Sequence, residues 1–218
     1  YTILNNRLKD IMDVKICNLT KANIQAAFNK DAERLKHKTI MNTHGLFNAA
    51  LTTIDESLTF NITFPEEEEV EIVIPTEEEM QKIFRSAKGK TIETAIYLAA
   101  MLGMRRSEIA ALKWEDIDFD KKIMHIHTAE VIDVDNKIIT KGTKKISSTR
   151  TVRIFEPVLQ HLKSLPRDSE YVHKFKSPNN ITHQFEYLLK KAGVPSYRFH
   201  DLRHYAVSAM LLVDMPKK

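Results

Sequence analysis

Hydrophobic residues in the first part of the chain recur every three or four positions, which predicts amphipathic helices. The pattern predicts one helix over residues 21–35, where Thr20 stands at the N-cap position. It predicts a second helix over residues 38–54. The expected apolar faces of these two helices consist of Ile24, Ala27, Phe28, Leu35, Ile40, Leu46, Phe47, Ala50 and Leu51. Residues 1–57 are therefore expected to form a small helical unit.

The helical pattern stops near residue 58 and resumes after Pro75. Pro65 and Pro75 bracket a run of glutamates and the alternating segment Val-Glu-Ile-Val-Ile, which predicts a linker with one short strand. Thr76 is expected to cap a new helix with Glu77–Glu79 in its first turn, where negative charge suits the helix dipole. The expected domains are a helical domain over residues 1–64, an acidic linker over 65–75 and a second domain over 76–218.

Helical and strand-like patterns alternate in the second domain. An apolar helix is expected over residues 91–102, followed by a short helix that Ser107 can cap. Residues 117–154 alternate as strands do, for example in Ile123-Met124-His125-Ile126. The remaining expected elements are a hairpin turn at Asp135-Asn136, a basic loop over residues 141–150, a return strand over 151–155 and helices over 156–164, 178–192 and 199–213. The pattern thus predicts a mainly α fold with a small antiparallel β-sheet, in the α+β class.

Composition narrows the class of protein. The chain has 218 residues, of which 43% are hydrophobic and only 5 are glycine, which suits a packed, mainly helical protein. Its one cysteine, Cys17, excludes an internal disulfide framework and is typical of a reducing, cytoplasmic compartment. No apolar run approaches the roughly 20 residues of a membrane span. The first residues lack the pattern of a signal peptide and a starting Met, so we interpret them as the edge of a fragment.

The net charge of +4 understates how basic most of the chain is. Eight of the 29 acidic side chains lie between Glu66 and Glu79, which leaves 33 basic against 21 acidic side chains elsewhere. A basic body with one acidic segment indicates a polyanionic partner such as nucleic acid. A solvated basic surface without such a partner is the alternative, since many cytosolic proteins are equally basic.

Three short segments carry the candidate chemistry. Gly-Met-Arg-Arg-Ser-Glu at residues 103–108 lies at a helix junction, Thr-Lys-Lys-Ile-Ser-Ser-Thr-Arg-Thr-Val at 143–152 lies between two strands, and His-Asp-Leu-Arg-His at 200–204 opens a helix. Arginines from two of these segments can hold one phosphate and stabilise the charge of its transition state. A lysine from the segment 143–152 can donate a proton to a leaving oxygen, and His200 can act as a base. No acidic metal cluster accompanies them, so the set indicates phosphoryl transfer without a metal or other cofactor.

Each segment also has a simpler structural explanation. Arg105 and Glu108 can form an i,i+3 ion pair on a surface helix, and lysines in a loop are usually solvated. His200 and His204 can be half of a metal site, although no third ligand stands at a suitable spacing. For each segment alone the structural explanation is favoured, whereas the order and spacing of all three together favour the chemical one.

Together, the three segments resemble the conserved boxes of the tyrosine recombinases of the phage or transposon integrase type. Residues 98–118 resemble the first arginine box nearly throughout, which implies Arg105 as the catalytic arginine and Arg106 as its variable neighbour. The segment before Ser-Ser-Thr-Arg-Thr-Val resembles the lysine loop and implies Lys144, with Lys141 and Lys145 as alternatives. The histidine–arginine box implies His200 and Arg203. The other candidate DNA contacts are Arg106, Lys141, Lys145 and Arg150, and residues 1–75 resemble the helical core-binding domain.

The resemblance also implies an activity and partners. In this family a tyrosine attacks a DNA phosphate and forms a 3′-phosphotyrosyl link, which a 5′-hydroxyl later reverses without ATP or metal. The implied partners are double-stranded DNA attachment sites, three further copies in a tetramer on two sites, and a host bending protein or excisionase. The implied setting is a bacterial or phage mobile element acting at the nucleoid. The alternatives are a type IB topoisomerase and a DNA-binding module without catalysis.

The chain departs from the family pattern after Arg203, where a nucleophilic tyrosine is expected further downstream. Tyr205 lies two positions after Arg203, on a different face of the helix, so we interpret it as a packing residue. The tyrosines Tyr97, Tyr171, Tyr187 and Tyr197 match no nucleophile context. We therefore expect the nucleophile to lie outside these 218 residues.

This expectation predicts that the 218-residue chain binds DNA but forms no covalent adduct with it. The test is a denaturing gel after incubation with labelled site DNA. A protein–DNA band in that gel would contradict the assignment.

Overall fold

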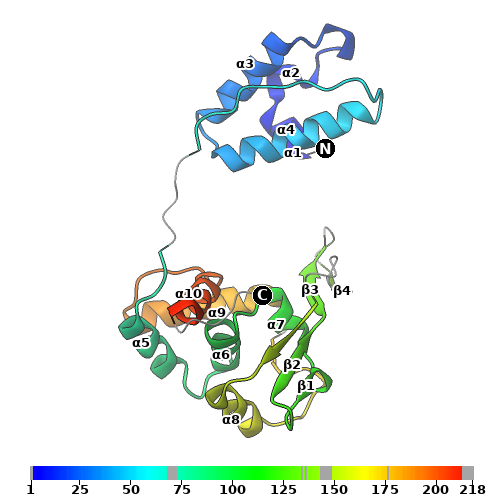
Figure 1. The fold of residues 1–218 in the computed structure, drawn as a ribbon. Coiled ribbons are helices and arrows are strands. Elements are labelled where there is room, and N and C mark those ends of the chain that lie inside the picture. Colours follow the sequence, from blue (N-terminus) through cyan, green and yellow to red (C-terminus); the bar gives the residue numbers. More distant parts are fainter. Residues whose placement is uncertain are drawn as a thin grey trace. The chain divides into compact units, whose positions relative to one another are not determined.

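The computed structural model describes residues 2–67, 73–133, 135, 137–142, 149–175 and 177–212. The chain divides into two compact units, Tyr1–Glu71 and Ile72–Lys218 (Figure 1). The elements confirm the predicted class, because helices dominate both units and the strands form small antiparallel sheets. Within the described residues, no helix combines the length and apolar character needed to cross a membrane.

The first unit is a helical cluster around one apolar core. Its elements are α1 (Thr2–Arg7), α2 (Lys9–Met12), the 3-10 turn η1 (Ile16–Asn18), α3 (Lys21–Ala32) and α4 (His37–Thr52). Thr20 caps α3 as predicted: its hydroxyl accepts the Asn23 N–H at 3.2 Å, and the Asn23 side chain accepts the Thr20 N–H at 2.9 Å.

The apolar face of α4 is narrower than the periodicity predicted. Its buried positions are Ile40, Thr43, Phe47 and Leu51, whereas Leu46 and Ala50 are exposed, which corrects the prediction for these two residues. The spacing of three and four residues follows a single stripe of the helix, and Leu46 and Ala50 fall beside that stripe.

Residues 58–64, which the expected domain bounds include in the helical domain, form an extended segment of the first unit. Every second side chain of this extended segment packs against the core, namely Leu58, Phe60, Ile62 and Phe64. Polar side chains of α3 and α4 satisfy its backbone. Asn48 accepts the Phe60 N–H and donates to the Phe60 carbonyl, both at 3.2 Å, and Gln25 pairs in the same two-way manner with Thr63.

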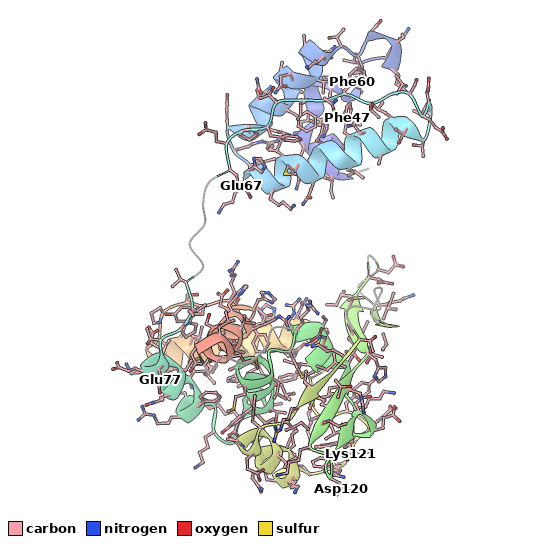
Figure 2. The ribbon with its side chains drawn as sticks, in the orientation of Figure 1. Phe47, Phe60, Glu67, Glu77, Asp120 and Lys121 are labelled. Atoms are coloured by element: carbon pink, nitrogen blue, oxygen red, sulfur yellow. The ribbon has the colours of Figure 1, made fainter. Side chains whose placement is uncertain are left out.

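Figure 2 labels Phe47 and Phe60 in this unit and Glu67 where its described chain ends. The short strand was predicted within Val-Glu-Ile-Val-Ile, residues 70–74. Residues 70–72 lie outside the described residues, and residues 73 and 74 form no strand.

The second unit begins with a helix capped as predicted, since the Thr76 hydroxyl accepts the Glu79 N–H and Glu79 accepts the Thr76 N–H in return. Its helices are α5 (Glu77–Ala87), α6 (Ile92–Leu102), α7 (Arg106–Ala111), the 3-10 turn η2 (Trp114–Asp116), α8 (Glu156–Ser164), α9 (Pro178–Ala192) and α10 (Asp201–Leu212). Its strands are β1 (Ile117–Asp118), β2 (Ile123–Ile126), β3 (Thr128–Ile132), β4 (Ile138–Gly142) and β5 (Arg150–Arg153).

Helix α6 is the centre of the second unit. It is buried on nearly all sides, and helices α5, α7, α8, α9 and α10 all contact it (Figure 1). A helix that is apolar all round has to be enclosed by others. The segments on either side of α6 and the distant α10 are therefore held against one common support.

The strands form two antiparallel pairings. One sheet has the order β1-β2-β5, with Met124 and Ile126 of β2 buried and His125 facing out, as the alternation predicted. The other is the hairpin β3-β4, in which Lys141 pairs with Ala129. The basic loop was predicted to start at residue 141, but β4 continues to Gly142. The predicted turn lies between Asp133 and Lys137, with Asn136 outside the described residues.

The two-way bond between Asn48 and Phe60 predicts that Asn48→Ala loosens the extended segment, because the Phe60 N–H loses its partner and the Phe60 carbonyl keeps only His44. We expect a loss of about 1–3 kcal/mol from the unfolding free energy of the first unit. Chymotrypsin cleavage after Phe60 should become faster. Asn42→Ala, at an exposed position of the same helix, is the control and should leave the cleavage rate unchanged.

Candidate functional site

The site begins where α6 ends at Gly103. This residue has φ 62°, in the left-handed region that glycine adopts without strain. Its N–H reaches the Ala99 carbonyl at 3.1 Å, and the Met104 N–H reaches the Leu98 carbonyl at 3.2 Å. The buried Met104 side chain then anchors the turn. Together these contacts place Arg105 at the N-cap of α7, on the surface of the unit.

The carboxylate of Glu108 fixes this turn. It is only 2% exposed and accepts the Arg105 N–H at 2.8 Å and the Arg105 Nη1 at 2.7 Å. Glu108 therefore caps α7, and the prediction that Ser107 caps this helix is wrong. Ser107 lies inside the helix, whose cap residue is Arg105. The i,i+3 ion pair anticipated as the simpler explanation for Arg105 is present.

A second arginine binds the same carboxylate from the sheet. Arg150, the first residue of β5, donates from Nη1 to Glu108 Oε1 at 2.9 Å and from Nη2 to Oε2 at 2.8 Å. Burial alone would raise the pKa of Glu108. The bonds and charges of Arg150 and Arg105 outweigh it, so the pKa lies below the usual value.

Arg203 approaches the same place from α10. Its Nη1 donates a hydrogen bond to the Gly103 carbonyl, one hundred residues earlier in the chain. Burial lowers the pKa of Arg203, and the positive charges of Arg105 and Arg150 lower it further, while Glu108 acts in the opposite direction. These interactions show that three guanidinium groups and one carboxylate share a single electrostatic environment.

His200 lies in the turn before α10, and Asp201 holds that turn. The buried Asp201 carboxylate accepts the Arg198 N–H at 2.8 Å and the Arg198 Nη2 at 2.8 Å, which repeats the arrangement of Glu108 with Arg105. Burial is the largest cause that lowers the pKa of His200. The positive charges of His204, Arg203 and Arg105 lower this pKa further. The imidazole is therefore neutral at pH 7 and able to accept a proton.

The structure thus brings together Arg105, Arg150, Arg203 and His200 from three separate segments. Arg106 is exposed and donates to the Thr182 hydroxyl of α9 at 2.7 Å. Lys144 and Lys145 lie outside the described residues. The backbone of Lys141 lies in β4, but its side chain is likewise outside the description.

Other candidate groups have structural surroundings. Tyr205 is partly buried against the core of the second unit, which confirms its interpretation as a packing residue, and burial raises its pKa. His200 and His204 pack edge to face, with ring centroids 5.0 Å apart. In the described part of the chain, no three His, Cys, Asp or Glu side chains gather as metal ligands.

The structural roles of Asp201 and of the buried Glu108 carboxylate were not predicted, and Glu108 was expected only as a surface ion-pair partner. A detectable signal was present, because each is an acid three residues after an arginine at a helix start, the spacing of a capping box. The pairing of Glu108 with Arg150 left no local signal, since the two are 42 residues apart.

The arrangement is suited to binding an anion. Arg105 Nη2 and Nε make no hydrogen bond to the described part of the chain, and the Arg105 side chain is 46% exposed. Three guanidinium groups around one carboxylate leave an excess of positive charge. A tetrahedral oxyanion placed beside Arg105 and Arg203 would receive charge-assisted hydrogen bonds, with His200 positioned near for proton transfer.

The lowered pKa of Glu108 predicts a pH-dependent contribution to stability. A carboxylate whose pKa is lowered by folding stabilises the folded state at pH values above its ordinary pKa of 4.5. This contribution is lost as the pH falls through the lower pKa of the folded state. Glu108→Gln should therefore lose roughly 1–3 kcal/mol near neutral pH. The difference in unfolding free energy between Glu108→Gln and the wild type should close below about pH 4.5.

The measurement is urea unfolding followed by the fluorescence of Trp114, the single tryptophan of the chain. Glu78→Gln, at an exposed position of α5, is the control. A gap between Glu108→Gln and the wild type that stays constant with pH would contradict the prediction.

Comparisons with known proteins show the family of the chain. The chain is 29% identical over 185 residues to a tyrosine recombinase XerC-like protein of Caldanaerobacter subterraneus subsp. tengcongensis, covering 71% of this chain and 47% of the relative. It is 28% identical over 131 residues to the integrase of Salmonella phage P22, covering 57% of this chain and 33% of that protein. The chain therefore spans less than half the length of these curated relatives.

Solved structures share the fold. The Tn1549 transposon integrase in complex with transposon right end DNA matches with a TM-score of 0.81 at 17% identity, over 99% of this chain and 82% of that one. A lambda integrase tetramer bound to a Holliday junction matches with a TM-score of 0.64 at 20% identity, over 94% and 61%. Residues 74–218 match the model of the phage integrase family. Because that match covers well over half of the chain and includes every arginine of the site, the chain belongs to the phage integrase family.

Proposed function

We propose that the protein is a site-specific DNA recombinase that cuts and rejoins DNA through a 3′-phosphotyrosyl intermediate. The observation that carries this proposal is the convergence of Arg105, Arg203 and His200, from distant segments, in a chain of the phage integrase family. Two guanidinium groups can stabilise the charge that develops in a phosphoryl-transfer transition state, and a neutral imidazole can accept a proton.

In the proposed reaction, Arg105 and Arg203 bind the non-bridging oxygens of one DNA phosphodiester. A tyrosine hydroxyl attacks the phosphorus, the new bond joins the tyrosine to the 3′-phosphate, and the bond to the 5′-oxygen breaks. His200 handles the proton on the nucleophile side, and Lys144 donates a proton to the leaving 5′-oxygen. A 5′-hydroxyl of the partner strand then attacks the phosphotyrosine and releases the tyrosine.

The first unit is proposed to be the core-binding domain that grips DNA, and Arg106, Lys141 and Lys145 to be further DNA contacts. Four protomers on two attachment sites, at the nucleoid, would carry out integration or excision of a mobile element, with a host bending protein or excisionase as helper. The transposon DNA complex and the Holliday-junction tetramer of the structural neighbours support this part of the proposal.

The test uses the complete protein and nicked duplexes that cover the DNA flanking its coding sequence. A nick close to the cleavage point lets the short fragment that carries the new 5′-hydroxyl diffuse away, so cleavage cannot be reversed. The covalent intermediate then accumulates and appears as a slow band in a denaturing gel. Relaxation of supercoiled plasmid without paired sites would indicate a topoisomerase, and binding without any covalent band would indicate a DNA-binding module.

On the duplex that forms this band, Arg105→Ala and Arg203→Ala should each reduce the rate of adduct formation by about 10²–10³-fold, because each removes a donor that stabilises the transition-state charge. DNA binding should largely remain and should weaken steeply with salt, since many phosphate contacts release counterions. Lys121→Ala is the control, because Lys121 is exposed at the far end of the second unit from α7 and α10 (Figure 2). If binding fell as much as cleavage, the two arginines would be general contacts or structural residues.

A further inference from the structure

We propose that Arg150 is a positioning residue that holds Arg105 ready for the phosphate through the carboxylate that both share, and that Arg150 does not itself contact DNA. The inference rests on the proposed function, because it assigns Arg150 a part in the same cleavage step. It replaces the expectation that Arg150 binds DNA directly.

The two arginines use Glu108 in different ways. Arg150 aligns both terminal nitrogens with both carboxylate oxygens, at 2.9 and 2.8 Å, and its side chain is 27% exposed. Arg105 gives the carboxylate one terminal nitrogen, at 2.7 Å, and is 46% exposed. The fork of Arg150 is thus occupied inside the protein, whereas Nη2 and Nε of Arg105 make no hydrogen bond to the described residues.

This division of bonds matters because Glu108 is buried. A buried carboxylate needs its lone pairs satisfied and its charge balanced. Arg150 meets most of that need with a planar, bidentate pair. If Arg150 were absent, Arg105 would be the nearest remaining partner of the carboxylate and would be drawn into a tighter pair with it. Its free nitrogens would then turn toward Glu108 and away from a bound phosphate.

The position of Arg150 in the fold supports the same role. It is the first residue of β5, pairs with Ile126 of β2, and follows the segment that carries Lys144 and Lys145. Its bond to Glu108 therefore fastens the strand that returns from the lysine segment to the helix that begins at Arg105. One ion pair links the second of the three sequence boxes to the first.

The experiment compares Arg150→Met, Arg150→Lys and the control Arg153→Met in the complete protein. Arg153 is an exposed arginine at the other end of the same strand. Two quantities are measured on the duplex that gives a covalent band: the single-turnover rate of adduct formation at saturating DNA, and the dissociation constant with its salt dependence.

For Arg150→Met we expect the rate to fall by roughly 100-fold, the size of effect that a small displacement of a catalytic group produces. The dissociation constant and its salt slope should stay close to those of the wild type. Arg150→Lys, which keeps the charge but offers only a point contact, should recover part of the rate. Arg153→Met should match the wild type in rate.

A different pattern would overturn the proposal. If Arg150→Met weakens binding as much as it slows cleavage, and the salt slope falls by about one, Arg150 is a phosphate contact. If Arg150→Met does not fold, Arg150→Lys carries the test, with a lower rate and unchanged binding as the expected result. An unchanged rate in a folded Arg150→Lys protein would also count against the proposal.

A second measurement keeps this inference separate from the proposed function. If the wild-type protein cleaves no DNA, the recombinase proposal fails, but the link between the arginines can still be read in the 218-residue chain by NMR of arginine side-chain Nε–H groups. The Arg105 signal, assigned with Arg105→Lys, should shift in Arg150→Met and stay unchanged in Arg153→Met. An unchanged Arg105 signal in Arg150→Met would refute the positioning role.

Discussion

The geometry of the site depends on one buried carboxylate, that of Glu108. It caps α7 by accepting the Arg105 N–H, pairs with the Arg105 guanidinium and binds the fork of Arg150 from β5. A carboxylate in such a place is stable only while its partners stay fixed, because an unpaired buried charge is expensive. The same set of bonds therefore positions the start of α7, the start of β5 and the arginines between them.

The apolar core holds the rest of the site in place. Helix α6 is enclosed by the other helices of its unit and ends at Gly103, whose left-handed conformation redirects the chain toward Arg105. The carbonyl of Gly103 also accepts the hydrogen bond of Arg203 from α10. One turn at the end of the core helix thus holds arginines from two distant segments, and the packed core fixes the position of that turn.

Local signals in the sequence were reliable where neighbouring residues decide the structure. Thr20 and Thr76 cap the helices that their spacing predicted, and the predicted bounds of α8 and α9 agree with the observed ones. The prediction that Ser107 caps α7 was wrong, because Glu108, which also binds Arg150 of β5, caps this helix. The backbone of the extended segment around Phe60 pairs with Asn48 of α4, a tertiary contact that no local pattern indicates.

The sequence by itself determined the fold class, the main helices and the three polar segments whose order resembles the integrase boxes, since these follow from periodicity, capping and short-range spacing. Only the tertiary structure decided which charges meet. Arg150 was expected at a DNA surface, and its partner turned out to be a carboxylate 42 residues away; the partner of Arg203 is a carbonyl 100 residues away. Such pairings depend on how the enclosed helix α6 and the strand β5 pack, and no pattern of neighbouring residues encodes that packing.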